Sequence, residues 1–258
     1  MSKIVDNIND IETIVSKQDT LVSGTNIKTI NGASVLGSGN MLVGATIDYQ
    51  EFTTSGTWTK PSGCNYVYVE ALGGGGSGTL TTGVDTTTGG AGGEGIYKVF
   101  NASDITSPVT ITIGLGGASK TTSGSGNSGG NTSFGIYLTA YGGSGGTDST
   151  SWAGTNRGSS NIFNSAQFYN PIFGFGAARN GNKGGASIYG GGGGAGTSTS
   201  QGGVMLGGIS EFAGKGGNTV FEGKGNDGTY PAGGGGGANG TATQSGAGAN
   251  GRVRVWCW

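Results

Sequence analysis

Residues 66–78 have the sequence YVYVEALGGGGSG, in which a regular alternation runs directly into four consecutive glycines. Within Tyr66–Leu72, valine and alanine alternate with tyrosine and glutamate, a period of two that is typical of a strand with one buried face. Glycine runs recur at 190–194 and 233–237. The sequence therefore predicts short strands interspersed with oligoglycine segments.

Further strands are expected on both sides of this stretch. Residues 51–54 and 57–60 flank Ser55-Gly56 and predict a hairpin. Strands are also expected at 96–100, 109–115 and 135–141, where apolar residues interrupt the glycine. The last residues, RVRVWCW at 252–258, alternate cleanly, and we expect them to close a sheet, since a free apolar end would invite aggregation. The predicted fold class is mostly β, with a β-sandwich-like body over 48–258.

The oligoglycine runs have two interpretations. They are either flexible linkers or ordered, extended three-fold helices of the polyglycine II type. Glycine keeps its N–H and allows backbones to approach closely, so packed segments could satisfy one another's polar groups. Ordering them costs about 1–2 kcal/mol per residue, which dense hydrogen bonding would have to offset. No strict Gly-X-Y period is present, which excludes collagen.

The N-terminal residues predict a helix and a short neck. Residues 1–24 carry a narrow heptad seam, which favours a trimeric coiled-coil stalk over a single helix packed on its own body. Residues 25–47, with the tight-turn dipeptide Asn31-Gly32, predict a β-meander neck that joins the stalk to the body. The residues expected to drive trimerisation are Ile4, Ile8, Ile11, Val15 and Val22.

The composition argues against several classes of protein. The chain has 258 residues, of which 62 are glycine, with 13 Lys and Arg, 14 Asp and Glu, and a net charge of -1. A neutral, sparsely charged chain does not fit nucleic acid, and no apolar run approaches the roughly 20 residues of a membrane span. The 9 Phe, 9 Tyr and 4 Trp argue against disorder, because disordered chains are poor in aromatics.

Sequence patterns typical of catalytic, metal-binding or nucleotide-binding sites are weak or absent. The absence of histidine excludes Ser-His-Asp catalysis and makes a zinc site very unfavourable. Residues 114–121 approach the nucleotide-loop pattern, but Ser119 replaces the second glycine and no helix is expected to follow. We expect no enzyme activity, no metal and no cofactor. For Cys64 and Cys257 we expect free buried thiols, with a disulfide as the alternative.

Four segments resemble glycine-rich bacteriophage tail-fibre and virion adhesin proteins. They are IKTINGASVLGSGN at 27–40, FTTSGTWTKPSGCNYVYVEALGGGGSG at 52–78, the region 109–146, and the terminal GRVRVWCW. The resemblance implies a virion structural protein, commonly trimeric, that is made in the bacterial host cytoplasm and helps to recognise the host. A purely structural fibre or decoration protein, on head or tail, is the alternative.

The insert 147–183 is the least glycine-like part of the body and is the expected attachment site. Loops on a rigid scaffold commonly carry function, and aromatic rings beside arginine suit a surface glycan or an outer-membrane protein. The phenylalanines of the insert favour a small core beneath the loop instead. The candidate receptor-binding residues are Trp152, Arg157, Tyr169 and Arg179.

Overall fold

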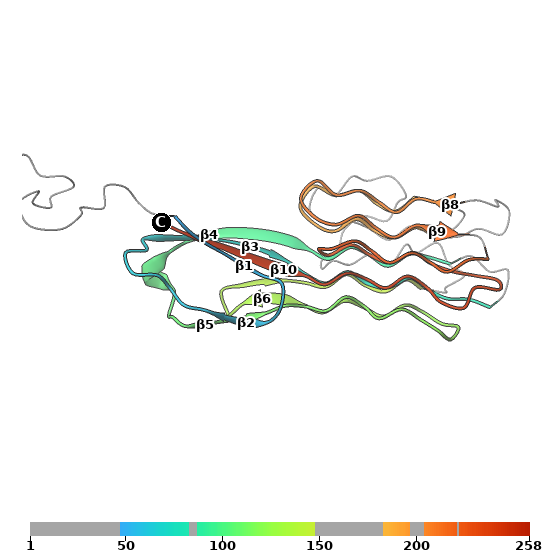
Figure 1. Ribbon diagram of the computed structural model, residues 1–258, viewed down its shortest axis with the longest axis horizontal. Helices are drawn as coiled ribbons and strands as arrows, with labels where there is room; N and C mark the ends of the chain where they lie inside the picture. Colours follow the sequence, from blue (N-terminus) through green and yellow to red (C-terminus); the bar gives the residue numbers. More distant parts are fainter. Residues whose placement is uncertain (1–46, 83–86, 148–182, 197–203, 221) are drawn as a thin grey trace, which may run out of the picture. The chain divides into compact units, whose positions relative to one another are not determined.

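The computed structural model describes residues 47–82, 87–147, 183–196, 204–220 and 222–258 (Figure 1). These belong to one compact unit, Ile47–Trp258. The predicted helix and neck, including Ile4, Ile8, Ile11, Val15 and Val22, lie outside the described residues. In the described part, the single helix is a 3-10 turn at Ala102–Asp104, so the body is mostly β as predicted.

Two antiparallel sheets of four strands form a sandwich (Figure 1). The first sheet has the spatial order β1 (Asp48–Phe52), β10 (Arg252–Cys257), β3 (Tyr66–Leu72) and β4 (Gly95–Asn101). The second has the order β2 (Gly56–Trp58), β5 (Val109–Thr112), β6 (Thr132–Phe134) and β7 (Leu138–Ala140). A two-stranded ribbon joins β8 (Val204–Met205) to β9 (Thr219–Val220). The C-terminal strand β10 lies between β1 and β3, so the last segment closes the first sheet.

The hairpin predicted at 51–60 is wrong. β1 pairs with β10 and β2 pairs with β5, so the chain passes from one sheet to the other between them. The Ser55 hydroxyl accepts a hydrogen bond from the Ile113 N–H at 3.0 Å and fixes this corner. Of the strand predicted at 135–141, only Leu138–Ala140 forms a strand, β7; the chain turns at Gly135, whose φ is 51°, and the preceding strand β6, with which β7 pairs, was not predicted.

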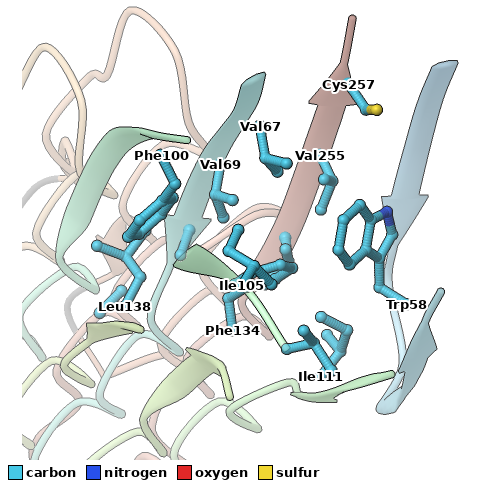
Figure 2. Close-up of a cluster of buried hydrophobic side chains, with 14 of the residues drawn as sticks. Trp58, Val67, Val69, Phe100, Ile105, Ile111, Phe134, Leu138, Val255 and Cys257 are labelled. Atoms are coloured by element: carbon cyan, nitrogen blue, oxygen red, sulfur yellow. The ribbon is translucent and has the colours of Figure 1, made fainter. Parts of the chain in front are cut away.

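The apolar faces of the two sheets meet in one core (Figure 2). Alternate residues of β3 and β10 point inward, among them Val69 and Val255, which have no exposed surface. From the second sheet, Trp58 and Phe134 are equally buried, with ring centroids 5.3 Å apart. Burial of large side chains of this kind typically contributes about 1.5–3 kcal/mol each. The sandwich is therefore the part of the body with a conventional hydrophobic core.

A disulfide joins Cys64 to Cys257, with Cα atoms 5.6 Å apart. The expectation of free thiols is thus wrong. β10 pairs with β3, and Cys64 lies just before β3 while Cys257 ends β10, so sheet pairing brings the two cysteines together. The bond ties the last strand of the body, β10, to the segment that precedes β3.

Beside the sandwich, the glycine-rich segments hydrogen-bond to one another with a repeat of three residues. Consecutive N–H groups donate to three different segments, and the fourth returns to the first one. The pairs are Gly73 to Glu94, Gly74 to Gly130, Gly75 to Ala249 and Gly76 to Ala91, with N···O distances of 2.8, 3.0, 2.8 and 2.8 Å. Three residues per turn is the geometry of the extended polyproline-type helix. This hydrogen bonding is what the polyglycine II interpretation predicts.

The run 233–237 continues the same arrangement with parallel neighbours. Gly234 and Gly237 donate to Gly192 and Ala195, so both partners advance by three residues. The linker interpretation is therefore wrong for 73–76, 190–194 and 233–237. We call the packed segments the glycine slab; it comprises the described residues within 73–94, 114–131, 141–147, 183–220 and 222–251 (Figure 1).

Close approach of backbones explains the glycine content. A Cβ added at Gly75 would lie 2.1 Å from the carbonyl oxygen of Gly233. At Gly234 it would lie 2.2 Å from the carbonyl oxygen of Gly90. Separations below 3.0 Å between a Cβ and a backbone atom are essentially never observed. At these positions of the slab, backbone packs directly on backbone, and glycine alone permits this because it has no Cβ.

Candidate functional site

The predicted receptor-binding residues Trp152, Arg157, Tyr169 and Arg179 lie outside the described residues. The structure does describe the residues on either side of this insert. Thr147 is held beside Thr88, whose hydroxyl accepts from the Thr147 N–H at 2.7 Å and donates to the Thr147 carbonyl at 3.1 Å. At the other end of the insert, the Gly184 N–H donates to the Leu206 carbonyl at 3.0 Å.

Other residues at which the described ranges begin or end lie near Thr147, at one end of the slab. Val204 pairs with Val220 across β8 and β9, which Figure 1 places at the end of the slab remote from the sandwich. Ala195 bonds to Gly237, and Ala238 bonds to Thr79 three residues before Thr82. We call this the distal end; it is bounded by residues 79–82, 87–88, 147, 195–196, 204 and 220. The described segments that end or begin at residues 82, 87, 147, 196, 204 and 220 therefore meet at one end of the slab.

Packing and polar contacts order the distal end. Leu80, Ala238 and Ala242 form a small buried cluster. The Gln244 side-chain amide donates to the Ser119 hydroxyl at 2.6 Å, and the Lys120 N–H donates to the Ser245 hydroxyl at 2.9 Å. These contacts link two segments that are far apart in the sequence and help to order this end of the slab.

The resemblance of 114–121 to a nucleotide loop has no structural counterpart. Gly117 donates its N–H to the Gly75 carbonyl at 2.8 Å, and Gly116 donates to the Asn250 side chain at 2.9 Å. Both N–H groups are therefore already hydrogen-bonded within the slab and do not face a phosphate. The described residues also contain no group of three or more His, Cys, Asp or Glu side chains placed to hold a metal ion.

A second surface was missed by sequence reasoning. Alternation in the first sheet sends one set of side chains into the core and leaves the other set on the outer side. We call the outer set the aromatic face; it consists of Tyr49, Tyr66, Tyr68, Tyr97, Trp256 and Trp258. The alternation at 66–72 placed Tyr66 and Tyr68 on one face of their strand, and that at 252–258 placed Trp256 and Trp258 on one face of theirs. It could not show that these strands are neighbours or that the face remains open.

Four rings of this face form a continuous row, while Tyr66 and Trp258 form a separate pair with ring centroids 6.0 Å apart. Tyr49 and Tyr68 each lie 5.1 Å from Trp256 between ring centroids, and Tyr97 lies 6.0 Å from Tyr68. The row continues onto the slab through Tyr189 at 5.4 Å from Tyr97. It ends at Phe212, which stacks on Tyr189 at 5.4 Å.

A network of paired charges lies alongside the row. Arg254 contacts Glu51 at 3.3 Å and Glu70 at 3.9 Å, and Arg252 contacts Glu70 at 2.9 Å. The Tyr49 hydroxyl donates to Glu51 at 2.7 Å, and this bond, reinforced by Arg254, lowers the pKa of the Glu51 carboxyl. Two acids and two arginines leave the network without net charge.

In the described part of the body, no helix is long and apolar enough to cross a membrane. A sequence model of a protein family described as a glycine-rich domain matches residues 51–258, which is most of the chain. A search of curated proteins gives no match.

Proposed function

The chain belongs to the glycine-rich domain family, and we propose that it is a bacteriophage virion fibre or tail-tip protein that mediates attachment to the host cell. It acts as a receptor-binding adhesin rather than as an enzyme, and it is made in the host cytoplasm and incorporated into the virion. Its receptor is a host surface glycan or an outer-membrane protein.

The observation that carries the proposal is that described residues flanking several of the inserts lie together at the distal end. Thr82, Thr147 and Val204 border three separate gaps between the described ranges, yet they lie at one end of the slab. A rigid scaffold that presents several loops at one end is a frequent design of binding proteins. Residues 147–183, with Trp152, Arg157, Tyr169 and Arg179, supply the binding side chains in this proposal.

We further propose a homotrimer assembled through the N-terminal segment, in which Ile4, Ile8, Ile11, Val15 and Val22 form the seam. The same segment contacts other virion proteins. Light scattering on the full chain is expected to give three times the chain mass of 25.2 kDa. Deleting residues 3–22 is expected to lower that mass, and an unchanged trimer would show that the helix does not drive assembly.

A binding assay of the labelled full chain on a panel of bacterial strains tests the adhesin proposal. Binding confined to some strains and lost on protease or glycosidase treatment of the cells is the expected result. The second candidate function is a structural fibre or decoration protein, which the backbone-only interior of the slab favours as a durable spacer. Labelling of intact virions with antibody, together with no binding to any strain, would support this second function and contradict the first.

A further inference from the structure

We propose that the aromatic face is the surface through which the glycine-rich bodies of several copies of this chain pack against one another. This association is separate from host attachment and from the N-terminal seam. It concerns the outer side of the first sheet, whose rings lie in the described part of the body.

The first reason is the exposure of the rings. Tyr97 is 52% exposed, and Tyr49, Tyr66 and Phe212 are exposed to a similar degree. Soluble monomers rarely leave a large contiguous apolar patch uncovered, and such patches mark interaction sites. The row from Tyr49 to Phe212 is contiguous through its ring contacts, so it is a single surface and not a scatter of surface residues.

The second reason is the kind of partner that this surface fits. Tyrosine, tryptophan and arginine are the residues enriched at the centres of protein interfaces. Small ligands, by contrast, bind in concave sites, whereas one side of a four-stranded sheet is a broad face. The surface is therefore suited to another protein.

The charges on this surface favour a second copy of this chain as the partner. Arg254 lies between Glu51 and Glu70, so opposite charges alternate across the strands. A surface with alternating, balanced charge does not repel a copy of itself and offers it opposite partners. A strongly acidic or basic partner would gain nothing from this network.

The position of the remaining chain points to the same partner. Residues 1–46 join the body at Ile47, immediately before β1, which contributes Tyr49 and Glu51 to the face. If that segment assembles the chains, it tethers the copies through Ile47, the residue that precedes β1. Tethering raises the effective concentration of a second contact into the millimolar range, so even a weak interface would be occupied.

Hydroxyl-radical labelling of the purified full-length protein tests the proposal. Tyr141 follows β7 in the other sheet and is 46% exposed, which makes it a matched reference for Tyr97. We expect Tyr97, Trp258 and Phe212 to be labelled several-fold more slowly than Tyr141. Equal labelling of Tyr97 and Tyr141 in the assembled protein would overturn the proposal.

Two substitutions and the addition of host envelope polysaccharide complete the test. Tyr97→Ser is expected to restore fast labelling of Trp258 and Phe212, whereas Tyr141→Ser is expected to leave it slow. Protection of the face that appears only when host envelope polysaccharide is added would also overturn the proposal, and would assign the face to a glycan. Binding to host cells is measured on the same variants: if Tyr97→Ser loses protection but keeps binding, the adhesin function stands independently.

Discussion

Glu94 binds Tyr141 through both its backbone and its side chain. The Glu94 N–H donates to the Tyr141 carbonyl at 2.9 Å, and the Glu94 carboxylate accepts from the Tyr141 N–H at 2.8 Å. Glu94 precedes β4 and Tyr141 follows β7, so this pair joins the two sheets where the sandwich meets the slab. The carboxylate is buried, and burial raises its pKa, while the bond from Tyr141 opposes the rise.

The first prediction is a pH dependence of stability that arises from Glu94. Because its pKa is raised in the folded state, its contribution to stability is fully present below the ordinary value near 4.5 and is lost as pH rises through the folded value. Glu94→Gln keeps an acceptor for Tyr141 and removes the titration. We expect the variant to have a higher free energy of unfolding than the wild type at neutral pH, with the difference shrinking towards pH 4. Urea unfolding of both proteins at each pH measures this; a constant difference across the range would contradict it.

The second prediction concerns a single methyl group in the slab. Gly234→Ala places a Cβ 2.2 Å from the Gly90 carbonyl oxygen, between backbones that cannot move apart without breaking their hydrogen bonds. We expect a loss of about 1–3 kcal/mol or more in the free energy of unfolding. Gly56→Ala is the matched control, since its nearest neighbours are side-chain atoms at 3.7 Å. Equal effects of the two substitutions on the denaturant midpoint would show that the slab is not tightly packed.

The third prediction concerns the disulfide between Cys64 and Cys257. A cross-link between residues 193 apart restricts the unfolded chain strongly, and losing such a bond typically costs about 2–5 kcal/mol. We expect a reductant to lower the melting temperature of the wild type and to leave that of the Cys64→Ala/Cys257→Ala double variant unchanged. A wild-type melting temperature that is insensitive to reductant, with two thiols titrated in the unfolded protein, would show that the bond does not form.

The fourth prediction concerns attachment through residues 147–183. Trp152→Ala or Tyr169→Ala is expected to weaken cell binding by about 1–2 kcal/mol per subunit, since a few aromatic residues usually carry most of an interface. Three copies on a trimer would enlarge the loss through avidity. Arg157→Ala and Arg179→Ala test the charged part of the same site. Melting temperature is the folding control: unchanged binding at unchanged stability removes the residue from the site, and a large drop in stability assigns it to a core.

The sequence predicted the strands that alternate visibly and missed those that do not. β3 and β10 stand out because their period of two lies beside glycine, whereas β8 and β9 have two residues each and no period to detect. The hairpin at 51–60 was misassigned because a turn dipeptide fixes a local bend and not the sheet that each strand joins. The hydrogen-bond partners of the glycine segments lie far away in the sequence, as Ala249 does from Gly75, so no local pattern predicts them.

Much of the candidate site was beyond sequence reasoning for a similar reason. Composition identified 147–183 as unusual, but the gathering of residues such as Thr147 and Val204 at one end of the slab depends on how many segments run side by side. The pairing of Cys64 with Cys257 depended on β10 lying next to β3. The openness of the aromatic face depended on the slab leaving that side of the sheet uncovered, although the residues themselves were visible in the alternation.

The three-residue repeat also sets a rule for how this body could lengthen. In a three-fold extended helix, each added residue advances the chain by about 3.1 Å and turns it by a third of a revolution. Gly73 and Gly76 donate to the same neighbouring segment, so only insertions in multiples of three would return each donor to its own partner. The length of the slab would then change in steps of about 9 Å, which is one turn of the helix. One or two extra residues would instead misalign every hydrogen bond beyond the insertion.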